Sequence, residues 1–215
     1  MLALHTTFES TGEDGTGKSK RKLEELDREA AIELCWDVIL ESVAVYASSN
    51  INDFFLLHGV TCAAGFPFIV EAMSSSSFLS AENMWCTHDI GKTLQAILEQ
   101  YVATLLGVYC VQGLPPLQAG KVEEKLFFGI KCGLTVQSDE SKNQLKKDEE
   151  WTEVVKRVLE RCDRDEHTYK LVHVCGLLRR RRPYTHDLCV LAARNLLKYD
   201  FVYTPRCWAE KNRGR

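Results

Sequence analysis

Residues 89–111, DIGKTLQAILEQYVATLLGVYCV, decide the fold class of this 215-residue chain. Apolar side chains recur there every three or four positions, at Ile90, Leu94, Ile97, Tyr101, Leu105 and Val108. That spacing places them on one face of an α-helix. The pattern stops at Gly113, Pro115 and Pro116, because proline cannot continue a helix. The stretch therefore predicts a long amphipathic helix with a sharp end.

Helical periodicity continues on both sides of this stretch. Before it, apolar residues repeat over 23–45, and a second apolar segment, 54–73, follows Asn52 and Asp53. Either of these two residues can cap a helix, and Pro67 should bend the helix that follows. After the central stretch we expect further helices over 121–132, 150–162, 165–180 and 184–199.

Strand patterns are nearly absent from the sequence. Only 133–136 and 201–204 are candidate strands, and both are short. The segment 137–150 is charged enough to predict a surface loop. We therefore predict an all-α protein, a single multi-helix domain with core helices at about 54–73 and 89–111.

Composition separates a helical domain from two polar ends. We expect a flexible N-terminal segment over 1–21, a helical domain over 22–208 and a basic tail over 209–215. The net charge of −3 gives no indication of nucleic-acid binding, and we expect none. Residues 179–215 nevertheless hold ten Lys/Arg against three Asp/Glu, a local balance of +7. This end is either a solvated basic surface or a docking surface for an anionic partner or a phosphate-bearing cofactor.

The nine cysteines and the N-terminus predict an intracellular, cytoplasmic protein. No two cysteines have the C-x-x-C spacing of a structural zinc site, and their odd number speaks against a secreted disulfide framework. The N-terminus lacks the basic-then-apolar order of a signal peptide. Two uncharged stretches, 54–70 and 100–120, approach membrane length, but prolines interrupt both. We expect core helices there and no membrane span.

One segment matches a phosphate-binding loop letter for letter. Residues 12–19, GEDGTGKS, fit the pattern G-x-x-x-x-G-K-[ST], whose backbone amides cradle phosphates. That loop requires a buried strand before it and a buried helix after it. Here the preceding residues make a poor strand, and the following residues 20–22 are all cationic. We therefore interpret the match as chance, in a flexible segment.

Three segments together resemble the questin oxidase-like family. They are 52–61, with its Phe-Phe-x-x-His-Gly-x-Thr pattern, 87–116, which leads into Leu-Pro-Pro-Leu, and 165–172, with its Asp-x-His-x-x-Lys pattern. They occur in the family's order, and 192–208 is similar to the family's ending. The resemblance covers roughly 25–208. Family members are longer, with a further N-terminal helical half, so the resemblance implies a truncated form.

The resemblance implies oxidative chemistry. Fungal relatives are linked to Baeyer–Villiger-type ring opening of anthraquinones with NADPH as reductant. If active, this chain would be an oxidoreductase, a Baeyer–Villiger-type monooxygenase that inserts oxygen into an aromatic, quinone-like substrate. The alternative is a non-catalytic helical remnant that binds a hydrophobic ligand or a protein, and such a remnant should expose an apolar patch or groove.

Three histidines and a lysine are the candidate catalytic residues: His58, His88, His167 and Lys170. His58 interrupts an apolar run, where it is either a buried general base beside an aromatic substrate or a buried histidine satisfied by a backbone carbonyl. The small Gly59 beside it would admit either a ligand or a close packing contact. His88 is either a partner of His58 or a contact at a helix start. His167 and Lys170 share a helical face. Lys170 would hold an anionic oxygen, or the face is simply solvated.

The sequence offers no cofactor or metal signature. The dinucleotide-binding glycine pattern of a Rossmann fold is absent, so NADPH is implied by the resemblance alone. No H-x-x-x-H or E-x-x-H spacing occurs, and we expect no metal. The expected partner is a hydrophobic aromatic small molecule. The catalytic hypothesis requires His58, His88 and His167 to converge on one site.

Overall fold

The computed structural model describes residues 28–49, 51–74, 90–112, 140–161, 165–198 and 201–202. The helices are α1 (Arg28–Ser48), α2 (Phe54–Ala63), α3 (Phe66–Met73), α4 (Ile90–Val111), α6 (Glu140–Leu159), α7 (Glu166–Arg181) and α8 (His186–Lys198). A 3-10 turn, Pro183–Thr185, precedes α8, and the two-residue strands β1 (Asn52–Asp53) and β2 (Phe201–Val202) pair in parallel. The predicted all-α fold is confirmed.

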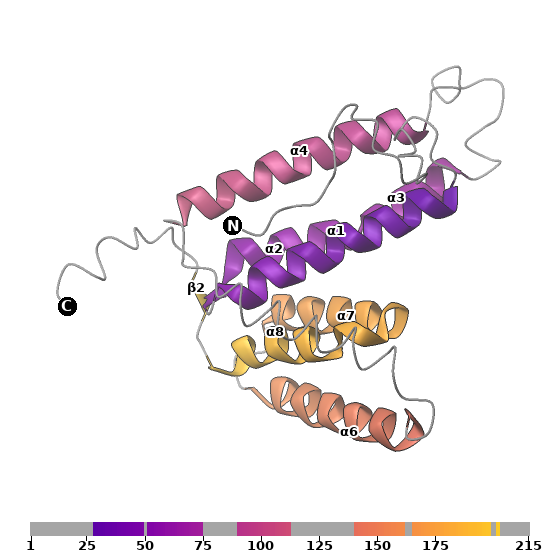
Figure 1. Cartoon of the computed structure of the whole chain (residues 1–215). Coiled ribbons are helices and arrows are strands. Elements are labelled where there is room, and N and C mark those ends of the chain that lie inside the picture. Colours follow the sequence, from indigo (N-terminus) through magenta and orange to yellow (C-terminus); the bar gives the residue numbers. More distant parts are fainter. Residues whose placement is uncertain are drawn as a thin grey trace, which may run out of the picture.

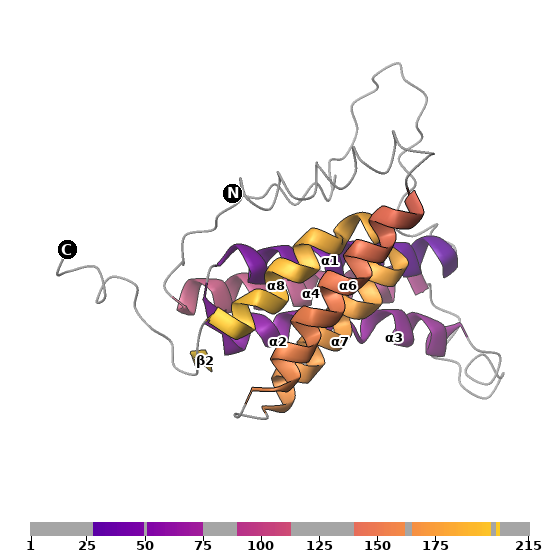
Figure 2. The same cartoon turned by 90° about the horizontal axis from the view of Figure 1, so that it is seen from below.

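The helices stack in layers, as Figure 1 shows. α1, α2 and α3 form the central layer, α4 covers one side of it, and α7 and α8 cover the other. α6 packs on the outer side of α8, and the view from below in Figure 2 shows α6 and α8 crossing the central helices obliquely. This arrangement buries α2 between α4 and α7.

The central layer supplies most of the core. Its buried apolar side chains are Ala31, Cys35, Ile39, Val43, Ala44, Tyr46, Ala47, Leu56, Leu57, Val60, Ala63, Phe66 and Val70. α4 adds Leu94, Leu98 and Tyr101. Leu94 and Tyr101 belong to the predicted stripe, whereas Leu98 is buried where the pattern named Ile97, which is only partly buried. α7 and α8 close the core from the other side.

A break divides the predicted helix 54–73 into α2 and α3. The backbone amides of Ala64 and Gly65 bond to carbonyls of α2 and end it, and α3 then begins with Pro67 in its first turn. Proline suits that position, because a helix leaves its first N–H groups unpaired. The predicted bend is therefore a full interruption, two residues before Pro67.

The predicted surface loop over 137–150 is wrong for most of its length, because α6 begins at Glu140. Within this helix Gln144 donates to Asp148 one turn later, and Asp148 accepts a hydrogen bond from Arg179 of α7 at 2.6 Å. Lys and Glu are good helix formers. Trp151, Val154 and Val158 supply the apolar face that the charged half lacks. Tertiary contacts thus stabilise a helix that charge alone made look like a loop.

Several expected elements fit the structure closely, and others lie outside the described residues. α7 and α8 match the predicted 165–180 and 184–199 within two residues, and the strand candidate 201–204 contributes Phe201–Val202 to β2. The expected helix 121–132, the strand 133–136, the segment 1–21 and the tail 209–215 lie outside.

Two stretches among the described residues are long and apolar enough to cross a membrane: Phe54–Met73 and Gly91–Val111. In the fold 39% and 17% of their windows are buried, and the break at Ala64–Gly65 interrupts the first. Length and composition alone do not separate a span from a core helix. The expectation of no membrane span therefore stays a prediction.

Candidate functional site

α2 and α7 begin side by side, and an aspartate caps each helix. Asp53 accepts the backbone N–H groups of Phe55 and Leu56 at 2.9 and 2.8 Å, and Asp165 accepts that of His167 at 2.8 Å. Both caps satisfy N–H groups that a helix start leaves unpaired. Because α2 packs against α7, these two helix starts bring side chains from distant parts of the sequence together.

His58 and His167 meet at this place. Their ring centroids lie 4.7 Å apart, with an angle of 44° between the rings. The ring of Phe54 contacts both, at centroid distances of 4.3 Å to His58 and 4.7 Å to His167. We call these three residues the histidine pair and its phenylalanine. They form a small aromatic cluster at the solvent edge of the α2–α7 contact.

On both imidazoles the nitrogen atom Nδ1 has a hydrogen-bond partner. Nδ1 of His58 lies 2.8 Å from the carbonyl oxygen of Phe54, and Nδ1 of His167 lies 2.6 Å from Oδ1 of Asp165. A carbonyl and a carboxylate accept, so each Nδ1–H donates. In a neutral imidazole the other nitrogen, Nε2, then carries the lone pair. The cluster thus offers two Nε2 atoms that can accept a proton.

A carboxylate links the histidine pair to Lys170. Oε1 of Glu166 lies 3.7 Å from Nε2 of His167 and accepts a hydrogen bond from Nζ of Lys170 at 2.8 Å. That hydrogen bond is the main reason why the pKa of Glu166 lies below its ordinary value. His167 and Asp165 are mostly covered, with 19% and 17% of their side chains exposed, whereas Lys170 is half exposed. Two carboxylates therefore border the pair, and the nearby amine is already paired.

The four candidate residues have different outcomes. His58 and His167 lie together, Lys170 reaches them through Glu166, and His88 lies outside the described residues. The expectation that His58 is buried is wrong, because its side chain is exposed. The apolar run around it faces the core with Leu56, Leu57 and Val60, while position 58 faces outward.

Gly59 permits a close helix contact. A methyl group at this position would come within 2.7 Å of Leu105 Cδ1 on α4. The hydroxyl of Tyr101, also on α4, donates to the Gly59 carbonyl at 2.9 Å and lies 2.6 Å from Ser42 Oγ on α1. Of the two uses open for this glycine, the structure has the packing contact. Burial raises the pKa of Tyr101 to about 12.

Phe54 and Asp165 were not singled out as site residues from the sequence. In the sequence, Asp165 stands out only within the Asp-x-His-x-x-Lys pattern, and Phe54 only within the Phe-Phe-x-x-His-Gly-x-Thr pattern. The Asp-x-His spacing in 165–167 was the available signal, because a capping aspartate can also reach the side chain two positions later.

The histidine pair lies apart from two hollows in the described part of the chain. One is an apolar slot at α1, α3 and α7, and the other is a polar depression between α6 and α7; neither is lined by His58 or His167. In the described part of the chain, no three His, Cys, Asp or Glu side chains have the arrangement of a metal site. The free cysteines recorded there are Cys35, Cys175 and Cys189, which are buried, and Cys62 and Cys110, which are exposed.

The comparison with protein families decides the ancestry of this site. A family model described as questin oxidase-like matches residues 18–175, well over half of the chain. The chain belongs to the questin oxidase-like family. Comparisons with curated proteins and with solved structures find no match.

The family match includes the whole candidate site. His58 and the box from Asp165 to Lys170 fall within residues 18–175, as do the phosphate-loop-like segment's last two residues. The segment 192–208, which resembles the family's ending, lies beyond the match. Membership in the questin oxidase-like family relates this chain to oxidoreductases. The substrate and the mechanism have to be argued from the chemistry of the site.

Proposed function

We propose that this chain is an oxidoreductase that inserts oxygen into an aromatic, quinone-like substrate at the histidine pair, with NADPH as reductant. The observation that carries the proposal is the pairing of His58 with His167 at 4.7 Å, with Asp165 hydrogen bonded to His167. Family membership supports the oxidative class of reaction.

The proposed role of the histidine pair is acid–base catalysis. Asp165 accepts the hydrogen bond from Nδ1–H of His167 and so keeps the proton on Nδ1. Nε2 is then the atom that accepts a proton from a substrate hydroxyl and later returns it. Nε2 of His58 is available in the same way. The half-buried ring of Phe54 contacts both imidazoles, and together these rings form an aromatic surface against which a flat aromatic substrate can pack. In the overall reaction that the family resemblance implies, one oxygen atom of O₂ would enter the substrate and the other would leave as water, and NADPH with one proton would supply the two electrons and two protons required.

The described surroundings of the histidine pair do not fit the phosphates of NADPH. Asp165 and Glu166 are both anionic, and the one neighbouring amine, Lys170, is paired with Glu166. A polyanion placed here would be repelled. The described residues around the histidine pair therefore offer no binding place for the phosphates of NADPH, and Lys170 has a positioning role through Glu166 in this proposal.

The test measures NADPH oxidation with a panel of hydroxyanthraquinones, with product analysis after reaction under labelled O₂. We expect substrate-dependent NADPH oxidation and one labelled oxygen in the product. His58→Gln and His167→Gln should each lower kcat at least tenfold, in line with the loss of an acid or base. His173→Gln is the matched control, because His173 is exposed on the same helix. Equal rates for wild type and both variants would refute the acid–base role.

A non-catalytic ligand- or protein-binding function is the second candidate, and exposed apolar side chains favour it. Phe68 is 64% exposed, Leu106 53% and Val111 62%. Such side chains on α3 and α4 are what an interaction surface would present. This alternative would be supported if the folded protein bound the hydroxyanthraquinones but showed no substrate-dependent oxidation of NADPH.

A further inference from the structure

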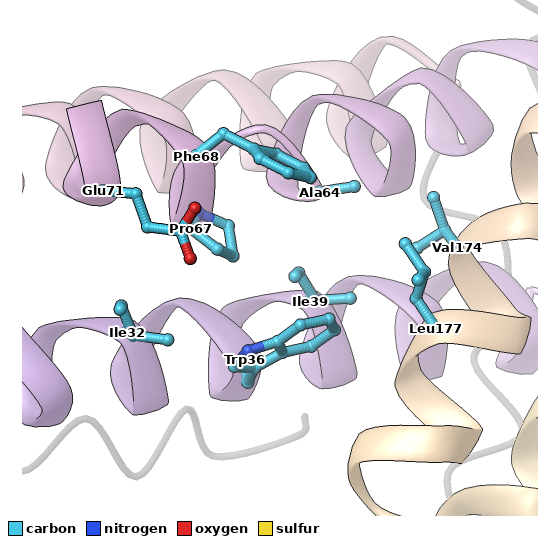
Figure 3. Close-up of a pocket in the computed structure, with 9 residues that line it drawn as sticks. All are labelled: Ile32, Trp36, Ile39, Ala64, Pro67, Phe68, Glu71, Val174 and Leu177. Carbon is cyan, nitrogen blue, oxygen red and sulfur yellow. The ribbon is translucent and has the colours of Figure 1, made fainter.

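An apolar slot opens between α1 and α3, and α7 closes one end of it, as Figure 3 shows. Its volume is about 120 Å³. The lining residues are Ile32, Trp36, Ile39, Ala64, Pro67, Phe68, Glu71, Val174 and Leu177. An engineered cavity of about 150 Å³ accepts benzene, so this slot has room for a single ring or a short alkyl group.

The slot combines two aromatic side chains with one carboxylate. In Figure 3 Trp36 lies on the α1 side and Phe68 on the opposite, α3 side, while Glu71 extends from α3 toward α1. Among the described residues that line the slot, Glu71 is the only charged one. Aromatic faces attract cations through their negative π-surface, and a carboxylate attracts them by charge. Together they favour an organic cation over a neutral or anionic molecule.

Glu71 has no hydrogen bond or ion pair within the described part of the chain. Glu33 and Asp148, by contrast, pair with arginines at α7. A carboxylate at the mouth of an apolar slot is thus left with its charge available. Phe68, on the same rim, is 64% exposed.

We propose that this slot binds a small organic ammonium compound that carries one aromatic ring. The ammonium group lies at Glu71, and the ring lies in the slot against Trp36. This site is separate from the histidine pair. Val174 of the slot follows His167 by seven residues on the same helix, a rise of about 10 Å. The proposal therefore stands whether or not the oxidation chemistry does.

The test titrates the intact chain with phenethylamine, 2-phenylethanol and 3-phenylpropionate, three probes of similar size that differ in charge. NMR chemical-shift changes of the slot's isoleucine and leucine methyl groups give Kd. We expect phenethylamine to bind about five- to tenfold more tightly than 2-phenylethanol, the gain from an exposed ion pair and a cation–π contact. 3-Phenylpropionate should bind most weakly.

Two variants assign the site. Glu71→Gln keeps the side chain's shape and should abolish the preference for the amine, while Glu153→Gln, an exposed carboxylate on α6, should leave it unchanged. Ala64→Leu fills the slot and should weaken the binding of all three probes. The proposal fails if no probe binds, if the amine binds no better than the alcohol, or if Glu71→Gln keeps the preference. It also fails if a folded Ala64→Leu variant binds as the wild type does.

Discussion

The rings of His58 and His167 contact each other with centroids 4.7 Å apart and a tilt of 44°, although they lie in helices far apart in the sequence. The contact exists because Asp53 and Asp165 cap α2 and α7 at neighbouring points of the fold. Each histidine lies within the first two turns after its cap. The two caps thus determine which side chains of α2 and α7 can meet at the solvent edge.

Asp165 should control the proton position on His167. In the wild type the Nδ1–H donates to Asp165, so one tautomer should dominate when the ring is neutral. Asp165→Ala should mix the two tautomers and cost about 1 kcal/mol of stability through the lost cap. Long-range ¹H–¹⁵N spectra of the imidazole report the tautomer, and urea unfolding reports the stability.

Asp165→Asn separates the two roles of this residue. Asparagine caps a helix as well as aspartate does, so stability should change little. The tautomer balance should still shift, because an amide oxygen accepts the Nδ1 proton less strongly than a carboxylate. An unchanged imidazole spectrum in both variants would contradict the contact.

Gly59→Ala should be less stable than Gly107→Ala by at least about 1 kcal/mol. Both glycines lie within helices, so alanine favours each helix equally by its intrinsic propensity. A methyl group at Gly59 meets Leu105 Cδ1 at 2.7 Å, whereas one at Gly107 meets nothing within 4 Å. Gly107→Ala should therefore stabilise by about 0.5–1 kcal/mol. Thermal and urea unfolding of both variants make the comparison, and equal gains would show that α4 does not press on α2.

Asp53 should make the fold less stable as pH rises. Burial raises the pKa of its carboxyl group, and one carboxylate oxygen, Oδ2, is buried without a hydrogen-bond partner among the described residues. The folded state therefore holds this proton more tightly than the unfolded state does. Its contribution to stability is present below the ordinary aspartate pKa of about 4 and is lost as pH rises through the raised value.

Asp53→Asn is the variant that isolates this effect. It keeps the cap and cannot ionise, so its stability relative to the wild type should increase between pH ~4 and pH ~7. Urea unfolding at several pH values measures the difference. Glu149→Gln, an exposed carboxylate on α6, is the control and should follow the wild type throughout. A constant difference for Asp53→Asn across this range would rule out the raised pKa.

Arg182 should hold the end of α7 on α1. Its side chain is only 11% exposed, and it donates to Asp37, to the Glu33 carboxylate and to the Glu33 carbonyl oxygen. Arg182→Met should cost about 1–2 kcal/mol, less than a fully buried pair because both carboxylates remain partly solvated. Arg180→Met, an exposed neighbour, should cost almost nothing.

Acid should weaken the same contact. The hydrogen bond from Arg181, helped by Arg182, lowers the pKa of Glu33. Its contribution to stability is therefore full above the ordinary glutamate pKa and is lost as pH falls through the lowered value. The loss of stability in acid should accordingly be smaller in Arg182→Met than in the wild type. The same acid sensitivity in both proteins would argue against the ion pair.

The ion-pair partners of the basic residues after 178 could not be predicted from the sequence. Composition predicted either a solvated surface or a docking site for an anionic partner. In the fold, Arg179, Arg181 and Arg182 bind carboxylates of α6 and α1. These arginines are paired with carboxylates from helices that are distant in the sequence, and composition does not show which charges will be paired in the fold. The same partners explain why α6 extends over the predicted loop.

The sequence alone determined the helical class, the stripe of α4 and the position of α7, and it narrowed the cap of α2 to Asn52 or Asp53, because period and capping are local properties. It also determined the family and marked His58 and His167 as the residues to question. Only the tertiary structure decided that these two rings meet, that His58 is exposed and that Gly59 serves a helix contact. Those facts depend on which helix faces pack together, and packing of distant segments is not encoded in any single stretch of the chain.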